Sequence, residues 1–171
     1  MDMASVGTTI PVEEYLRTTY HPDCEYVDGL IVERNVGESK HSRAQRRLIR
    51  LFAALEESLR AFAYPELRVQ VKRGRFRIPD VTIVLGAEIS EAYLTTPPFL
   101  VIEVLSPDDR HGDLLEKVRD YLEFGVPYVW VINPESRRGE IYTSEGMRDA
   151  ADGIMRTADP AIEVPLAEIL S

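Results

Sequence analysis

Two short, almost wholly apolar runs constrain the fold of this chain more than any other feature. Residues 99–105 read Phe-Leu-Val-Ile-Glu-Val-Leu, and residues 128–132 read Tyr-Val-Trp-Val-Ile. Such runs are typical of β-strands that are covered on both faces. Between them, residues 112–124 place apolar side chains at helical spacing, and a Gly-Val-Pro segment follows. The pattern predicts a strand–helix–strand unit with parallel strands and a right-handed crossover.

The remaining segments predict further strands and helices around this unit. A chain of 171 residues suits one domain, which we expect to span residues 1–171. We therefore predict an α/β fold with a central mixed β-sheet flanked by helices. The other expected elements are a short helix from Pro11, a hairpin turning at Asp28-Gly29, a long helix over 41–63, strands over 67–72 and 76–85, an edge strand over 139–143 and a short final turn over 166–170.

Composition indicates an ordinary globular protein of a reducing compartment. Apolar residues make up 44% of the chain, which is enough for a hydrophobic core. The single cysteine, Cys24, excludes an internal disulfide framework. No apolar run approaches the roughly 20 residues that cross a bilayer. We expect a cytoplasmic protein without a membrane segment.

The charge distribution is strongly uneven. The net charge of −9 argues against nucleic-acid binding, yet residues 40–77 contain 11 basic and 3 acidic residues. One interpretation is a solvated helix face followed by an edge hairpin. The other is a basic face that meets phosphates. The candidate nucleic-acid contacts are Arg43, Arg46, Arg47, Lys72, Arg73, Arg75 and Arg77.

Two isolated acids lie in apolar strand sequences. Glu103 stands in the middle of the run 99–105, where a charge costs several kcal/mol unless it is paired or binds a metal. Asp80 opens a second apolar strand directly after Pro79. For Glu103, the alternative is a structural carboxylate that a buried arginine or backbone donors hold. For Asp80, the alternative is a turn at the start of a strand, where the side chain binds nearby N–H groups. As a pair, the two carboxylates suit Mg²⁺ or Mn²⁺.

Lys117 is the third candidate. It borders the apolar stripe of the helix predicted over 112–124, and its long stem can carry the ammonium across apolar surface. The alternative is an exposed lysine that pairs with Asp113 or Asp120 on the same helix.

Several motifs in order resemble one protein family over about residues 11–142. The motifs are Arg-Ile-Pro-Asp-Val at 77–81, Ile-Glu-Val-Leu-Ser-Pro at 102–107 with Lys117 and Tyr121 downstream, and Gly-Val-Pro-Tyr-Val-Trp-Val-Ile-Asn-Pro at 125–134. This series is similar to the Uma2 family, formerly a domain of unknown function. That family is placed in the PD-(D/E)XK nuclease superfamily, which has a restriction-endonuclease-like fold.

The resemblance implies a Mg²⁺-dependent endonuclease that hydrolyses phosphodiester bonds of DNA. Asp80, Glu103 and the backbone carbonyl of Val104 would hold Mg²⁺ or Mn²⁺, and Lys117 would act on the water or the transition state. In its common short form, the superfamily has a lysine two residues after the second acid. Leu105 stands there in this chain, as in Uma2-like sequences, and the lysine is shifted onto the following helix.

The family pattern also points to Glu25 as a water-mediated metal ligand and to His41 as a phosphate contact. For Glu25, the alternative is a surface strand residue opposite a basic side chain. For His41, the alternative is a simple polar residue at a helix start. His21 and Cys24 have a zinc-like spacing, with His41 further on, but three such residues in loops and at a helix start do not make a convincing tetrahedral site. Cys24 lacks an evident base partner and is set aside as a nucleophile.

Three functions remain open from the sequence. The first is the DNA endonuclease. The second is a catalytically silent nucleic-acid-binding or assembly protein on a nuclease fold, which the net charge of −9 favours. The third is a hydrolase of smaller phosphodiesters. Small nucleases of this fold often pair to address two strands, so we also expect a homo-oligomer, most simply a dimer.

Overall fold

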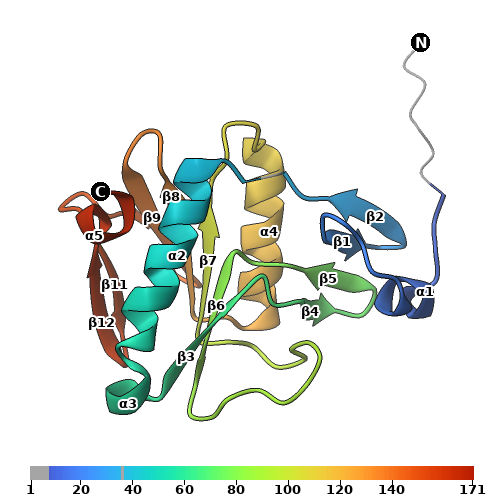
Figure 1. Cartoon of the computed structure of the whole chain (residues 1–171), viewed down its shortest axis with the longest axis horizontal. Helices are drawn as coiled ribbons and strands as arrows, with labels where there is room; N and C mark the ends of the chain where they lie inside the picture. The colour runs from blue at the N-terminus through green and yellow to red at the C-terminus, as the bar shows by residue number, and fades with distance from the viewer. Residues whose placement is uncertain (1–7, 36) are drawn as a thin grey trace.

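A mixed six-stranded β-sheet forms the centre of the computed structural model, which describes residues 8–35 and 37–171 (Figure 1). Its strand order is β10-β9-β8-β7-β6-β3. Strands β7 and β8 are parallel, and the other neighbours are antiparallel. The strands are β3 (Ala61–Pro65), β6 (Val81–Leu85), β7 (Leu100–Val104), β8 (Tyr128–Asn133), β9 (Arg138–Thr143) and β10 (Gly146–Asp149).

Helices cover both faces of this sheet, as the sequence predicts. Helix α2 (Ser39–Ala53) packs on one face, where Leu48 and Phe52 join the core cluster of Ile102 and Trp130. Helix α4 (His111–Phe124) connects β7 to β8 and packs on the other face through apolar side chains such as Val118. Side chains of a strand alternate between faces, so Glu103 lies on the α4 side of β7.

A smaller four-stranded sheet lies beside α4, with order β2-β1-β5-β4 (Figure 1). Helix α1 (Val12–Arg17) packs against it through Tyr15, which stacks on Tyr26 and contacts Phe76. Its strands are β1 (Cys24–Val27), β2 (Leu30–Glu33), β4 (Val69–Lys72) and β5 (Arg75–Arg77). Valines of β4 share the core cluster of α4, so the small sheet and the helix form one wall.

The C-terminal residues cover the α2 side of the large sheet. A hairpin of β11 (Ile154–Ala158) and β12 (Ala161–Pro165) leads into α5 (Leu166–Leu170), which packs against α2. Within the part of the chain that the structure describes, no helix has the length and apolar character needed to span a membrane.

The helix predicted over 41–63 is wrong at its C-terminal end. Helix α2 stops at Ala53, a short α3 (Glu56–Leu59) follows, and Arg60 adopts a left-handed φ of +49° that breaks the helix. Residues 61–65 then form β3, which pairs with all five residues of β6. The helical spacing of apolar side chains therefore extends past the end of the helix into residues 61–63, which form a strand. Pairing with β6 at the sheet edge outweighs this local periodicity.

Three other expectations differ in detail. The strand predicted over 76–85 is divided into β5 and β6 around Pro79, which carries the chain from the small sheet to the large one. Strand β9 is interior, because β10 pairs with its outer side. The hairpin β11–β12 has no counterpart in the prediction, whereas the final turn over 166–170 corresponds to α5.

Candidate active site

A cavity of about 440 Å³ opens between the small sheet, the C-terminal end of β7 and helix α4. Its wall contains all the residues predicted for catalysis and metal binding, although they come from separate parts of the chain. These residues are Glu25, Asp80, Glu103, Val104 and Lys117, together with His41.

Asp80 is buried at the junction of the two sheets and accepts three protein donors. Its Oδ1 lies 2.9 Å from Nη2 of Arg34 and 3.1 Å from Nε2 of His41, and its Oδ2 accepts the N–H of Val104 at 2.7 Å. Burial would raise the pKa of this carboxyl, but the hydrogen bonds and charges of these donors hold it below the ordinary value. Asp80 is therefore an anion at neutral pH.

Glu103 has the opposite electrostatic character. Its side chain is 5% exposed, and Oε1 accepts the Tyr121 hydroxyl at 2.6 Å. No other donor among the described residues is bonded to this carboxylate. Burial raises its pKa to about 7. The charge of Lys117 lowers this pKa, whereas the negative charges of Asp80 and Glu25 raise it further. A carboxylate with so few donors is poorly compensated, which is characteristic of functional sites.

Lys117 points to this cluster and not to solvent. Its Nζ lies 3.1 Å from Oε1 of Glu25, and its side chain is 22% exposed. Burial would lower the pKa of the ammonium, but the charges of Glu103 and Glu25 raise it above the ordinary value. The lysine does not pair with Asp113 or Asp120 among the described contacts, and its raised pKa makes it a cationic donor.

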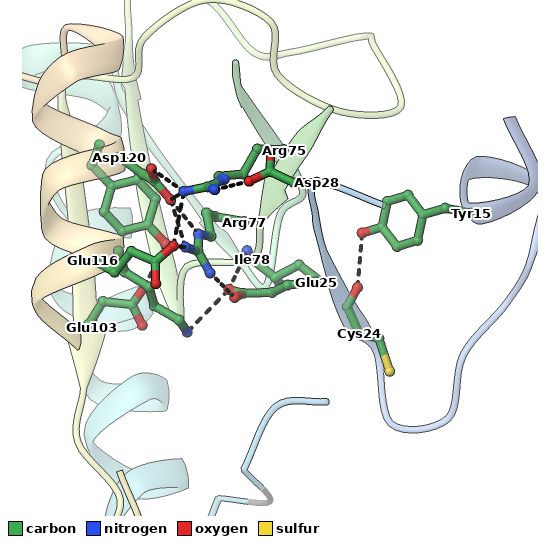
Figure 2. A network of polar contacts seen from close by, with 12 residues as sticks. Tyr15, Cys24, Glu25, Asp28, Arg75, Arg77, Ile78, Glu103, Glu116 and Asp120 are labelled. Carbon is green, nitrogen blue, oxygen red and sulfur yellow. Dashed lines mark hydrogen bonds and ion pairs between the residues drawn. The ribbon is translucent and has the colours of Figure 1, made fainter. Parts of the chain in front are cut away.

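Glu25 lies at the centre of the polar network in Figure 2 and is only 1% exposed. Its Oε1 accepts the N–H of Ile78 at 3.0 Å, and its Oε2 accepts Nη1 of Arg77 at 2.9 Å. Burial would raise its pKa, but Lys117 and Arg77 lower it. Glu25 is thus a buried anion that holds Lys117, and not the surface strand residue of the alternative interpretation.

Two arginines of β5 connect the small sheet to α4 (Figure 2). Arg77 Nε and Nη2 bind Asp120 Oδ2 at 2.8 and 2.7 Å, and Arg77 Nη1 binds Glu25. Arg75 binds Asp28, Asp120 and Glu116. Carboxylates already surround both guanidinium groups, so contact of Arg75 and Arg77 with nucleic acid, which stays a prediction, would compete with these ion pairs.

The other predicted nucleic-acid contacts lie outside the cavity wall. Arg43, Arg46 and Arg47 are on α2, while Lys72 and Arg73 are at the β4–β5 turn. None of these five residues forms an ion pair with a described carboxylate. Their contact with nucleic acid stays a prediction. His41 lines the cavity, where Asp80 raises its pKa by a hydrogen bond against the opposing effect of burial.

The donors at Asp80 and Glu103 fit a hard divalent cation. A carboxylate offers about four acceptor positions, so the three donors on Asp80 leave one, and Oε2 of Glu103 has no described donor. The described residues contain no group of three or more His, Cys, Asp or Glu side chains that could hold a metal ion. Further ligands would therefore have to be a backbone carbonyl, such as that of Val104, and water, as is usual for Mg²⁺.

Sequence reasoning missed three members of this site. Arg34 follows β2 without any periodic pattern, yet it binds Asp80 and lies 3.5 Å from Glu66. Tyr121 was noted only as part of the family motif, without a role in the site. Asp120 was considered only as a partner for Lys117, whereas it binds arginines 43 and 45 residues earlier in the chain. A single sequence carries no signal for such distant pairs.

Comparisons with known proteins agree on the fold class and the family. A family model described as "Uma2: Putative restriction endonuclease" matches residues 12–161. A solved structure described as "a putative nuclease belonging to DUF820 from Anabaena variabilis ATCC 29413" matches with a TM-score of 0.82 at 20% identity, covering 94% of this chain and 97% of that chain. At this identity the likeness concerns the fold, and it confirms the predicted architecture. No curated protein matches the chain.

Proposed function

The chain belongs to the Uma2 family, and from this premise we propose that it is a divalent-metal-dependent endonuclease that hydrolyses phosphodiester bonds of DNA. The observation that carries the proposal is the Glu103 carboxylate. It lines a cavity beside Asp80 and Lys117, is almost fully buried, and has one described donor. A structural role does not require a poorly compensated charge there, whereas a metal ligand does.

Asp80, Glu103 and the Val104 carbonyl would hold Mg²⁺ or Mn²⁺. When bound, such an ion lowers the pKa of a coordinated water and stabilises negative charge on phosphoryl oxygens. Lys117 is kept protonated by Glu25 and Glu103, so it donates to the attacking water or to a phosphoryl oxygen and does not serve as a base. Tyr121 holds Oε1 of Glu103, which leaves Oε2 as the oxygen available to a ligand.

Glu25 has a different role in this proposal from the one expected of it. Its oxygens bind Lys117, Arg77 and the Ile78 N–H. It therefore orients the ammonium group of Lys117, and a water-mediated contact to a metal would be an additional role. Arg77 and Asp120 in turn fix Glu25 against α4.

Nicking of supercoiled plasmid DNA tests the proposal. We expect the purified protein to form nicked circles with Mg²⁺ or Mn²⁺ and to lose this activity with excess chelator. Glu103→Ala, purified in parallel, is expected to be inactive, and Lys117→Met to be slower by about 10²-fold because one stabilising donor is lost. The exposed Glu145→Gln is the matched control. Equal nicking by wild type and Glu103→Ala would identify a contaminating nuclease and refute the proposal.

One observation favours the second candidate, a silent nucleic-acid-binding or assembly protein. Arg34, His41 and the Val104 N–H already neutralise and bind Asp80, so a metal must share this carboxylate with them. If the protein binds duplex DNA but shows no metal-dependent nicking, this candidate replaces the enzyme.

The homodimer expected from the sequence is also a proposal. The edge strand β2 exposes Leu30 and Val32, and Val32 also lines the catalytic cavity, so a second copy at this edge would bring two cavities together. Sedimentation is expected to show a dimer at micromolar concentration. A monomer throughout that range would contradict the proposal.

A further inference from the structure

A second hollow, of about 260 Å³, lies on the other side of α2 from the catalytic cavity. It is formed by the first half of α2, the turn between β8 and β9, and the end of α5, which meet near the top left of Figure 1. Its basic lining residues are Lys40, Arg43, Arg47 and Arg137. None of the residues assigned to catalysis or metal binding contributes to it.

The charge of this hollow is unusual for a chain with net charge −9. Its single acidic side chain, Glu135, is occupied by Lys40, whose Nζ lies 2.7 and 2.8 Å from the two carboxylate oxygens. Within residues 8–35 and 37–171, Arg43, Arg47 and Arg137 have no carboxylate within ion-pair distance. Three guanidinium groups therefore line one hollow without an ion-pair partner among the described residues.

Two of these guanidinium groups are held in place by the backbone. Arg47 Nη1 lies 3.4 Å from the carbonyl oxygen of Ile169, and Arg137 Nη1 donates to that of Leu170 at 3.0 Å. Arg137 also adopts a φ of +58°, a conformation that favours glycine or asparagine at a turn. Planar guanidinium groups with several donors are suited to phosphate oxygens.

Helix α2 connects the hollow to the catalytic cavity. Lys40 lines the hollow, and the next residue, His41, contacts Asp80. The N-terminal part of α2 therefore borders both sites, and an α-helix is about 10–12 Å across with its side chains. This helix diameter corresponds to roughly three base-pair steps of a DNA duplex. A strand in the catalytic cavity could therefore reach the hollow without a large bend.

We propose that this hollow, with Arg43, Arg47 and Arg137, binds a backbone phosphate of the DNA substrate a few nucleotides from the bond that is cleaved. The inference rests on the proposed function and deepens it, since it makes a duplex, and not a small phosphodiester, the substrate of the catalytic cavity. The acidic body of the protein repels DNA elsewhere, so this contact sets the path of the backbone across the N-terminal half of α2.

A structural role is the competing explanation for two of the three arginines. Arg47 and Arg137 bind carbonyl groups at the end of α5, where positive charge is favourable. That role predicts lower thermal stability on substitution and no change in DNA affinity. Arg43 has no described protein partner, so its substitution separates the two explanations.

Fluorescence anisotropy with a labelled 20-base-pair duplex, in the presence of chelator, measures binding without hydrolysis. Arg43→Ala/Arg47→Ala/Arg137→Ala is expected to bind on the order of 10- to 100-fold more weakly, and the slope of log affinity against log salt should fall by about 2–3. Arg43→Ala alone should reduce the slope by about 1 without changing the melting temperature. The matched control removes three exposed arginines elsewhere, as Arg17→Ala/Arg119→Ala/Arg148→Ala.

Several outcomes would overturn the inference. They are equal loss of affinity in the two triple variants, unchanged affinity in the first, or no binding of the duplex by the wild-type protein. The proposed nuclease activity fails by a different readout, because metal-dependent nicking is measured separately. Duplex binding that depends on these arginines but comes without nicking would support the phosphate site and refute the enzyme.

Discussion

Replacing Arg77 with methionine is expected to lower the free energy of unfolding by about 3–5 kcal/mol. Arg77 is buried and binds both Glu25 and Asp120, which are also buried. Methionine fills similar space but leaves two carboxylates without their main counterion, and an uncompensated buried charge is more costly than a lost contact. Such a loss is a large part of the 5–15 kcal/mol that stabilises a typical domain.

Urea unfolding at neutral pH measures this effect through the transition midpoint. Arg119→Met is the matched control, since Arg119 is an exposed arginine of α4 without a described ion pair, and its substitution should change stability by less than about 0.5 kcal/mol. Lys117 and Arg77 lower the pKa of Glu25, so at a pH low enough to protonate Glu25 the difference between Arg77→Met and wild type should shrink. Equal midpoints for the two methionine variants at neutral pH would show that the network contributes little to stability.

The network also explains how the small sheet positions Lys117, the proposed catalytic cation. Arg77 attaches β5 to α4 through Asp120 and holds Glu25 of β1 at the same time. Glu25 binds Lys117, which lies three residues before Asp120 on α4. The ammonium is therefore fixed from both the helix and the small sheet, as the proposed replacement of a lysine at position 105 requires.

The sequence was informative where a charge interrupted an apolar pattern. Glu103 in β7 and Asp80 before β6 could be identified because a strand covered on both faces does not tolerate an unpaired acid. The parallel pairing of β7 with β8 followed from the helix between them. Lys117 needed the family resemblance, because a lysine at the border of a helix stripe is ordinary.

Contacts between distant segments were not predictable from one sequence. Arg34 and Asp80 are 46 residues apart, and neither position indicates the other. The strand β3 was missed because Leu55, Leu59 and Phe62 continue the apolar spacing of α2, and only pairing with β6 decides against a helix. In the second case, tertiary pairing outweighed the local pattern.

Glu103→Gln is expected to abolish function and to stabilise the protein. The amide keeps the shape of the side chain and can still accept the Tyr121 hydroxyl, but it is a poor ligand for a hard cation. If the metal no longer stabilises the transition state, the loss of several kcal/mol corresponds to a decrease of about 10³-fold or more in nicking rate. The same change removes a buried charge, so its effects on activity and stability should have opposite signs.

The stability gain should depend on pH in a defined direction. Burial raises the Glu103 pKa from 4.5 to about 7, so between these values the unfolded chain has released a proton that the folded protein retains. Wild-type stability therefore falls as pH rises through this window. Glutamine does not titrate, and Glu103→Gln should exceed wild type by about 3 kcal/mol at pH 8 but match it near pH 4.5.

Thermal unfolding with and without Mg²⁺ completes the test, because a ligand that binds only the folded protein raises its melting temperature. At pH 8, Mg²⁺ should stabilise wild type by ionic pairing with Glu103 and leave Glu103→Gln unchanged, with Glu145→Gln behaving as wild type. If Glu103→Gln is less stable than wild type at pH 8, the carboxylate has a structural partner and its burial does not indicate a metal site. If both proteins respond equally to Mg²⁺, the ion binds elsewhere.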